Sequence, residues 1–261
     1  MTTIVHLTDL HCPPDDPRQA EALVTAVSAI APVLVAVTGD LTRAERRSEY
    51  RMARAVLARL GAPVLAVPGN HDVPVWAPWE RVFAPFARFE AYVGRGRTTF
   101  AADGLFAAGL NTAGAVQARL GWSLGIAPRS RVAETASAVA SALPDVVRAV
   151  LAHHPLLPED SDPYRSQTIG GASALAALTE AGADLYLFGH LHAPLARPAA
   201  PGGPLLVASP AGFGNRDRGH GAGFSVIAAA DGTATVTPHL WDGTAYAPGT
   251  PATFPLPRLQ G

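Results

Sequence analysis

Lysine is absent from this chain of 261 residues, and all 20 basic residues are arginine. Schiff-base chemistry and a phosphate-binding P-loop are excluded, because both need a lysine. Cys12 is the only cysteine, which excludes disulfides, iron–sulfur clusters held by several thiolates, and zinc ribbons. Any metal in this protein must therefore be bound by His, Asp, Glu or Asn.

Excess charge and long apolar runs are missing as well. The net charge is −1, so the chain as a whole is not suited to binding nucleic acid or an anionic membrane. No apolar run reaches the roughly 18 residues that a transmembrane helix needs, and the first residues are typical of a strand rather than of a signal peptide. We therefore expect a cytoplasmic protein without a membrane or nucleic-acid partner; a homo-oligomer is compatible with the sequence.

The order of elements predicts an α/β fold. Hydrophobic residues make up 48% of the chain, enough for a sizeable core. Short apolar runs alternate with segments of helical periodicity in the first half, which predicts a parallel sheet, whereas the last strands follow one another without helices. The predicted strands are 3–7, 33–37, 64–67, 105–110, 146–152, 185–188, 204–209, 223–229 and 233–241, and the predicted helices are 17–31, 48–60, 130–143 and 172–180. We expect one domain over residues 1–241 and an extended Pro/Gly-rich tail over residues 242–261.

Polar residues that suit a metal follow five of the predicted strands. They are D-x-H at 9–11, G-D at 39–40, G-N-H-D at 69–72, H-H-P at 153–155 and G-H-x-H at 189–192. The carboxyl ends of strands in such folds meet at one edge, and carboxylate oxygen and imidazole nitrogen bind hard and borderline ions. Because one aspartate can bridge two ions, and two ions roughly 3.5–4 Å apart can hold a phosphate and activate water, the pattern indicates a binuclear metal site.

In this order the five motifs resemble those of the calcineurin-like metallophosphoesterase family, from the first strand to about residue 240. The resemblance implies a four-layer α/β/β/α sandwich of the metallophosphoesterase type. It also implies hydrolysis of a small phosphoester by in-line attack of a hydroxide that bridges two ions of iron, manganese or zinc. Within the family, the short single-domain chain, Gly-Asn-His-Asp and His-His-Pro together look most like the bacterial class III cyclic-nucleotide phosphodiesterases.

The resemblance also implies a role for each motif residue. The metal ligands would be Asp9, His11 and His192 for the first ion, Asn70, His153 and His190 for the second, and Asp40 as the bridge. His71 would be a catalytic histidine beside the leaving-group oxygen, and Asp72 would orient it. The motif turns contain no Arg, so a diester, with one negative charge, is favoured over a monoester. A glycerophosphodiester, a phosphomonoester and an inactive metal-binding scaffold are the alternatives.

Several residues near the motifs have two interpretations. His154 lies either behind the ligands or against the substrate, and Arg216 and His220, in a Gly-rich loop, bind substrate or face solvent. Aromatic residues recur at helical spacing over residues 76–92, which favours a core-facing helix kinked at Pro85; a wall beside the active site is the alternative. Arginines at 43, 47, 51 and 54 predict a solvated helix face rather than a phosphate site.

Overall fold

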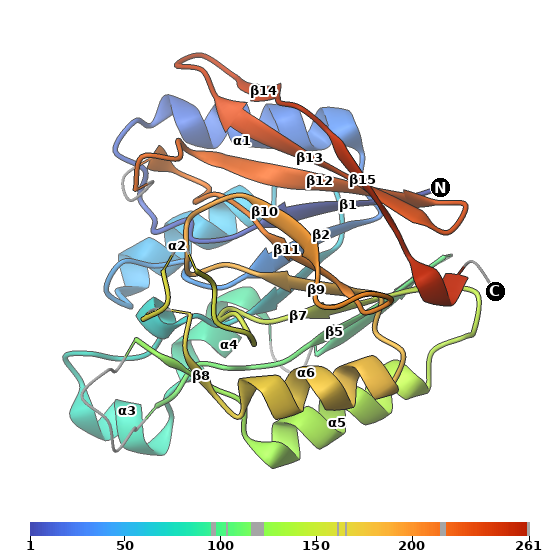
Figure 1. Cartoon of the computed structure of the whole chain (residues 1–261). Helices are drawn as coiled ribbons and strands as arrows, with labels where there is room; N and C mark the ends of the chain where they lie inside the picture. The colour runs from blue at the N-terminus through green and yellow to red at the C-terminus, as the bar shows by residue number, and fades with distance from the viewer. Residues whose placement is uncertain are drawn as a thin grey trace.

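The structure, a computed structural model, describes residues 1–94, 98–102, 104–115, 123–160, 162–164, 166–214 and 218–259. Two mixed β-sheets face each other, and helices cover the outer face of each sheet (Figure 1). This is the predicted four-layer α/β/β/α sandwich. None of the described helices combines the length and hydrophobicity of a membrane span.

The first sheet has the strand order β14-β13-β12-β1-β2-β3, with β15 paired to β13. Its strands are β1 (Thr2–Leu7), β2 (Leu34–Thr38), β3 (Val64–Val67), β12 (Gly223–Ala230), β13 (Thr233–Trp241), β14 (Tyr246–Pro248) and β15 (Ala252–Pro255). β1, β2 and β3 are parallel because α1 (Arg18–Ile30) and α2 (Arg47–Leu57) form the crossovers between them. β12 is antiparallel to β1 and to β13.

The second sheet has the order β10-β11-β9-β7-β5-β4. Its strands are β4 (Thr99–Ala102), β5 (Leu105–Gly109), β7 (Val147–Leu151), β9 (Leu185–Phe188), β10 (Leu195–Pro198) and β11 (Leu205–Ala208). α5 (Arg129–Ala140) and α6 (Gly171–Glu180) lie below this sheet in Figure 1. β6 (Gly125–Ile126) and β8 (Thr168–Ile169) form a separate two-stranded sheet.

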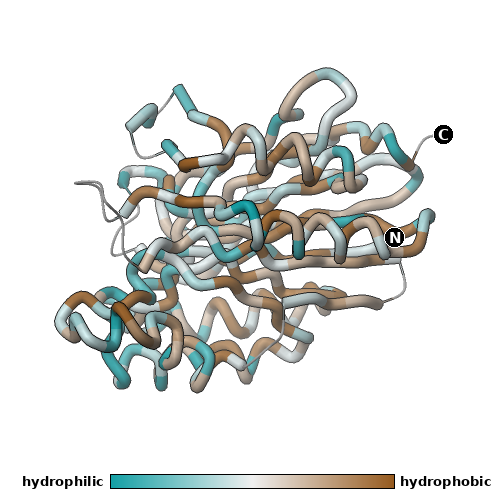
Figure 2. Tube along the Cα trace, turned by 90° about the horizontal axis from the view of Figure 1, so that it is seen from below, coloured by the Kyte–Doolittle hydropathy of each residue, from teal (hydrophilic) through white to brown (hydrophobic). Residues whose placement is uncertain are grey.

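Apolar side chains fill the three spaces between the four layers. Ile4 and Leu65 of the first sheet share a buried cluster with Leu187 of the second, whereas the next residue in β1, Val5, packs on the opposite face with α1 and α2. This alternation follows from the two-residue period of a strand. Brown stretches mark these apolar strands in Figure 2. Burial of each of these aliphatic side chains contributes about 1.5–3 kcal/mol to the stability of the fold. The packed cores therefore hold the two sheets together, with their strand ends at one edge.

The segment after residue 241 is part of the fold, which corrects the expected tail. β14 and β15 both pair with β13. Leu256 is 1% exposed, and the Arg258 guanidinium forms an ion pair of 2.6 Å with Asp184. The Pro-rich composition conceals these strands, because proline is tolerated in edge strands that leave one row of amides unpaired.

The aromatic segment also differs from the expected core-facing helix. It forms two short helices, α3 (Pro78–Phe83) and α4 (Ala87–Val93), on either side of Pro85. Trp76, Trp79 and Phe83 are 83%, 76% and 77% exposed. Only the second helix packs inward: Phe89 is buried. The expectation is therefore wrong for α3, because periodicity shows that a face is apolar but not that another element covers it.

Candidate metal centre

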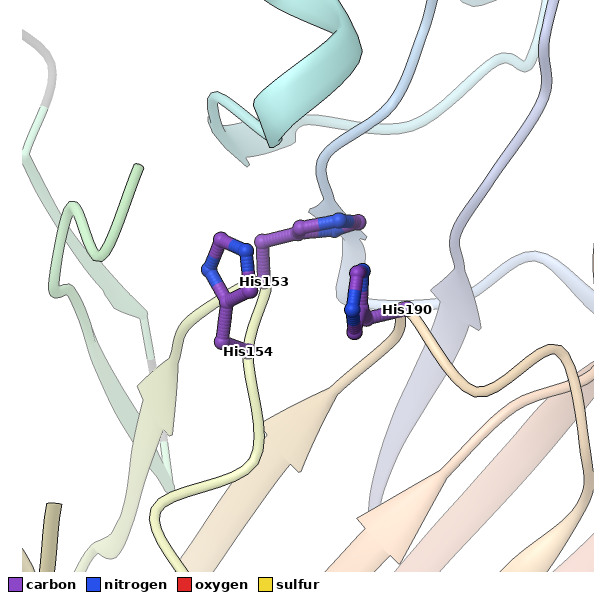
Figure 3. A group of neighbouring side chains, drawn as sticks. All are labelled: His153, His154 and His190. Carbon is purple, nitrogen blue, oxygen red and sulfur yellow. The ribbon is translucent and has the colours of Figure 1, made fainter. Parts of the chain in front are cut away.

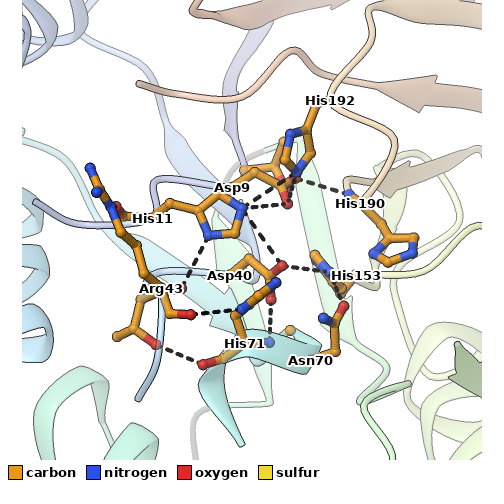
Figure 4. A network of polar contacts seen from close by, with 12 residues as sticks. Asp9, His11, Asp40, Arg43, Asn70, His71, His153, His190 and His192 are labelled. Atoms are coloured by element: carbon orange, nitrogen blue, oxygen red, sulfur yellow. Dashed lines mark hydrogen bonds and ion pairs between the residues drawn. The ribbon is translucent and has the colours of Figure 1, made fainter. Parts of the chain in front are cut away.

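The predicted site residues follow the carboxyl ends of β1, β2, β3, β7 and β9, and the backbone ties the turns to one another. The amide of Asp9 donates to the carbonyl of Gly39 at 3.0 Å, and the amide of His11 donates to the carbonyl of Asp40 at 2.9 Å. Within the second sheet, the amide of Gly189 donates to the carbonyl of His153 at 3.0 Å, and the amide of His190 donates across to Asp9 Oδ2 of the first sheet's turn at 2.9 Å. These bonds place residues far apart in sequence in one buried network (Figure 4).

The backbone of these turns adopts a conformation that side-chain-bearing residues rarely take. Nine non-glycine residues in the described part of the chain have a positive φ. Five of them are predicted ligands: Asp9, His11, Asp40, His190 and His192. Each such residue costs on the order of 1–3 kcal/mol and persists only where the surroundings hold it. The concentration of this strain at the predicted ligands marks the turns as a functional site.

Asp9, His11 and His192 form the first group of candidate ligands, with their ligand atoms within 4.8 Å of one another. The Nε2 atom of His192 is 3.0 Å from Asp9 Oδ1 and 3.4 Å from His11 Nε2. All three residues are buried. One carboxylate and two imidazoles around one buried point are a suitable donor set for a borderline cation.

Asp40 lies between this group and a second one. Its Oδ2 atom is 3.9 Å from His11 Nε2 and 3.3 Å from His153 Nε2. Its Oδ1 atom accepts a hydrogen bond of 2.8 Å from the backbone N–H of His71. Oδ2 is therefore the oxygen that faces both groups.

The second group contains His153, Asn70 and His190. Asn70 belongs to a short 3-10 helix, η1 (Asn70–Asp72), and its Oδ1 atom lies 3.1 Å from His153 Nε2. The rings of His153 and His190 meet edge to face, with centroids 5.1 Å apart. All seven predicted ligands thus converge on one site, and their binding of metal remains a proposal.

The residues present fit bound cations. Within the described residues, His190 Nε2 is buried without a hydrogen-bond partner, an arrangement that costs about 1–3 kcal/mol unless an ion contacts it. Burial lowers the pKa of His190 far below its ordinary value, so the neutral ring keeps a lone pair for a ligand bond. Burial alone would raise the pKa of Asp40, but the neighbouring His153 keeps it well below its ordinary value. The carboxylate is therefore charged and available.

Two glycines are required by close contacts within the site. A Cβ atom on Gly189 would lie 1.8 Å from Thr8 Oγ1 and 2.6 Å from Asp9 Oδ2. A Cβ atom on Gly69 would lie 2.1 Å from Asp40 Oδ1. Any larger residue at these positions would displace a candidate metal ligand.

Three threonines that the sequence analysis did not single out orient the ligands. The Thr8 hydroxyl donates to Asp9 Oδ2 at 2.7 Å, which leaves Oδ1 for a metal. The carbonyls of Thr38 and Thr42 accept hydrogen bonds from the Nδ1 atoms of His153 and His11, at 2.7 and 3.1 Å. Such contacts select the tautomer with Nε2 available. Thr8 directly precedes Asp9, and Thr38 ends an otherwise apolar strand; both positions are recognisable signals.

His71 lies beside the ligands, as predicted, but Asp72 does not orient it. The Nδ1 atom of His71 donates to the backbone carbonyl of Arg43 at 2.8 Å. The carboxylate of Asp72 instead accepts hydrogen bonds from the amides of Leu41, Thr42 and Gly69, at 3.2, 3.1 and 3.0 Å. Asp72 is fully buried. Its predicted catalytic role is therefore corrected to a structural one, because it joins the turns after β2 and β3.

Of the two interpretations of His154, the structure favours a position behind the ligands and corrects the one against the substrate. Figure 3 shows it beside His153 and His190, and the three rings form a third compact group. However, His154 is 0% exposed, and its Nδ1 and Nε2 atoms are bonded to Thr112 Oγ1 at 2.9 Å and to the carbonyl of Ser123 at 3.1 Å. Burial lowers its pKa to about 3, so it stays neutral behind the ligands.

The remaining predicted substrate contacts lie in the loop after β11. His220 is exposed in this loop. Arg216 lies outside the described residues. The loop begins beside the site, since the amide of Gly212 donates to the carbonyl of Thr8 at 2.9 Å. A substrate contact of His220 or Arg216 therefore remains a prediction.

The glycerophosphodiester phosphodiesterase GpdQ of Enterobacter lignolyticus (strain SCF1) is 49% identical over 41 residues, which are 16% of this chain and 15% of that protein. The match to this curated relative therefore spans only a small part of either protein.

Two solved structures share the fold over nearly the whole chain. A dimetal phosphatase from Danio rerio matches with a TM-score of 0.67 and 12% identity, covering 98% of this chain and 99% of that one. The purple acid phosphatase PPD1 from yellow lupin (Lupinus luteus) seeds matches with a TM-score of 0.64 and 15% identity, covering 97% and 53%. At these identities the likeness concerns the fold alone.

A family model described as calcineurin-like phosphoesterase matches residues 2–194. This range contains all five turns that carry the candidate ligands, from Asp9 to His192. The family uses a dinuclear metal centre, which agrees with the position of Asp40 Oδ2 between His11 and His153. By this match, the chain belongs to the calcineurin-like phosphoesterase family.

Proposed function

We propose that this protein is an enzyme that hydrolyses phosphoesters, diesters in preference to monoesters, at a binuclear metal centre. The ligands in this proposal are Asp9, His11, Asp40, Asn70, His153, His190 and His192. The observation that carries it is the position of Asp40 Oδ2, which lies 3.9 Å from His11 Nε2 in one group and 3.3 Å from His153 Nε2 in the other. A carboxylate shared between two sets of donors is what a two-ion centre needs.

The donor set of carboxylates, imidazoles and one amide oxygen is compatible with iron, manganese or zinc. Such ions, when bound, hold phosphoryl oxygens and lower the pKa of coordinated water. The protein's own contribution is to fix the donors. Asp9 Oδ2 is occupied by the Thr8 hydroxyl and by the amide of His190, at 2.7 and 2.9 Å, which leaves Oδ1 for the ion.

His71 supplies the proton for the leaving group in this proposal. It belongs to none of the candidate ligand groups formed by the described residues. Because Nδ1 donates to the carbonyl of Arg43, Nε2 is the nitrogen that can face an ester oxygen. The ring also meets the His11 ring edge to face at 5.0 Å, which places it beside the first group. A positioned acid of this kind contributes about 10²–10⁴-fold to turnover.

The charges around the site support a diester substrate. A monoester carries about two negative charges near neutral pH and a diester one, so monoester sites commonly add fixed cations. Arg43 is ion-paired with Asp15 at 2.6 Å, and Arg218 lies 3.9 Å from Asp162. Both arginines are therefore balanced by carboxylates. The name of the partial relative GpdQ, a glycerophosphodiester phosphodiesterase, also favours a diester.

The test is the ratio of kcat/KM for bis(p-nitrophenyl) phosphate and p-nitrophenyl phosphate with manganese-reconstituted protein. We expect the diester to be hydrolysed faster. A monoester preference of tenfold or more would reject the diester assignment and leave the metal centre intact. Cyclic nucleotides and glycerophosphodiesters, tested next, distinguish the two natural diester classes. An Asp40→Ala protein purified in parallel is the control for contaminating phosphatases.

The same panel addresses the alternative of a metal-binding scaffold without activity. Such a protein would bind two ions per chain and hydrolyse none of the esters. We expect turnover instead, because His71 and all seven candidate ligands are present in the site.

A further inference from the structure

Two consecutive peptide carbonyls orient two histidines: His11, a member of the first metal group, and His71, which lies beside it. The carbonyl of Thr42 accepts a hydrogen bond from His11 Nδ1 at 3.1 Å, and the carbonyl of Arg43 accepts one from His71 Nδ1 at 2.8 Å. Figure 4 shows the second bond, with Arg43 and His11 on the same side of the site. The position of this short stretch of backbone therefore determines where both rings point.

Neighbouring turns hold the backbone around Thr42, and the N–H of the peptide that follows Arg43, that of Ala44, donates to Glu49 Oε2 at 3.0 Å. Thr42 forms an isolated bridge with Cys12, and its amide and hydroxyl both donate to Asp72 Oδ1, at 3.1 and 3.0 Å. Arg43 is the first residue beyond this bridge. Two residues later, Glu45 has a φ of 59°, in the left-handed region.

The side chain of Arg43 holds residue 43 against the first turn. Its Nε atom donates to the carbonyl of His11 at 2.9 Å, and Nη2 donates to the carbonyl of Pro13 at 2.5 Å. Nη2 also contacts Asp15 Oδ1 at 2.6 Å. The guanidinium thus spans several acceptors on the turn that carries a predicted metal ligand. A planar group with several fixed N–H donors can bond to all these acceptors at once, whereas the ammonium group of a lysine cannot.

We propose that Arg43 is a positioning residue for His71: its side chain fixes the peptide whose carbonyl orients the His71 ring toward the leaving group. This inference rests on the proposed role of His71 as a proton donor. Arg43 acts through His71 and not on the substrate, because Nε and Nη2 are directed at backbone carbonyls and the charge is paired with Asp15.

The test uses two diesters that share one spectator group and differ in the leaving group, methyl phenyl phosphate and methyl p-nitrophenyl phosphate. Nitrophenolate leaves with little protonation, whereas phenolate needs more. In Arg43→Met we expect kcat for the phenyl ester to fall roughly 10–100-fold, the usual effect of removing a group that orients a functional histidine. We expect a much smaller change for the nitrophenyl ester, with KM and metal content unchanged. Arg51→Ala, at an exposed arginine of α2, is the matched control.

A double-mutant cycle separates the two roles of Arg43. If Arg43 acts through His71, Arg43→Met has no further effect in a His71→Ala background. An equal loss in both backgrounds would show a direct substrate contact and overturn the inference. Arg43→Lys, which keeps the charge but not the fork of donors, should behave like Arg43→Met; full activity of Arg43→Lys also contradicts the inference. If His71→Ala is as active as the wild type on the phenyl ester, the proposed acid role fails, and the inference fails with it.

Discussion

The hydroxyl of Thr8 offers a direct test of how the first metal group is organised. Thr8 and Asp9 are both 0% exposed, and the hydroxyl donates to Asp9 Oδ2 at 2.7 Å. Thr8→Ala removes this donor and leaves the amide of His190 as a donor to the same oxygen, at 2.9 Å. The carboxylate then gains freedom to rotate, and Oδ1 loses its fixed position.

The magnitude follows from the loss of one hydrogen bond to a charged group. Such a bond contributes about 1.5–3 kcal/mol, and a tenfold change in affinity corresponds to about 1.4 kcal/mol. The affinity of the first ion should therefore fall roughly 10–100-fold, in agreement with the usual effect of mutating a residue that orients a metal ligand. The second ion should be affected less, because the described hydrogen bonds link Thr8 to His153 only indirectly, through the carbonyl of Thr38, which lies 3.2 Å from the Thr8 hydroxyl and 2.7 Å from His153 Nδ1.

The measurement is a competition titration of manganese into metal-free protein, with Thr8→Ser as the control. Serine keeps the hydroxyl and loses only the methyl group, so the difference between the two variants reports the hydrogen bond. Unfolding of both metal-free variants is measured alongside. Equal metal affinities for Thr8→Ser and Thr8→Ala would refute the idea that this hydroxyl orients Asp9.

Three further predictions concern the centre and its surroundings. Asp40→Ala should lose both ions, whereas His11→Ala should mainly weaken one; elemental analysis that finds two ions in Asp40→Ala contradicts the bridging role. In metal-free protein, burial lowers the pKa of His153 but Asp40 raises it to a net value of about 9. The stability that the protonated ring contributes is thus complete below pH 6.5, the ordinary pKa. It is lost as the pH rises from 6.5 through about 9, by about 3 kcal/mol. Urea unfolding at several pH values that shows no such fall argues against this prediction. Trp79→Ala should change stability by no more than about 0.5 kcal/mol, while Phe89→Ala should cost about 3–5 kcal/mol; thermal unfolding that gives equal losses would show that α3 is covered.

The metal centre could be predicted from the sequence because its signals are local. D-x-H, G-D, G-N-H-D and G-H-x-H each follow a short apolar run, and strand ends of a parallel sheet meet at one edge. Short apolar runs also predicted the strands, since strands such as β2 and β9 are buried along their whole length, as is usual in a covered parallel sheet. The elements and the convergence of the seven candidate ligands follow from these two regularities.

Contacts between distant segments decided the roles of the polar residues beside the candidate ligands. Asp72 lies next to His71 in sequence, yet its carboxylate accepts hydrogen bonds from the turn after β2, and local spacing cannot show which amides will surround a carboxylate. His154 likewise follows a ligand but is enclosed by Thr112 and Ser123.

The exposure of α3 and the pairing of the strands after residue 241 were also decided by contacts between distant segments. An apolar stripe or a Pro-rich segment becomes core or surface according to what packs against it. The sequence by itself determined the donors of the site and the strands that carry them. Only the tertiary structure decided which neighbouring groups orient those donors, because a hydrogen bond such as that from His71 to Arg43 depends on the meeting of two turns 28 residues apart.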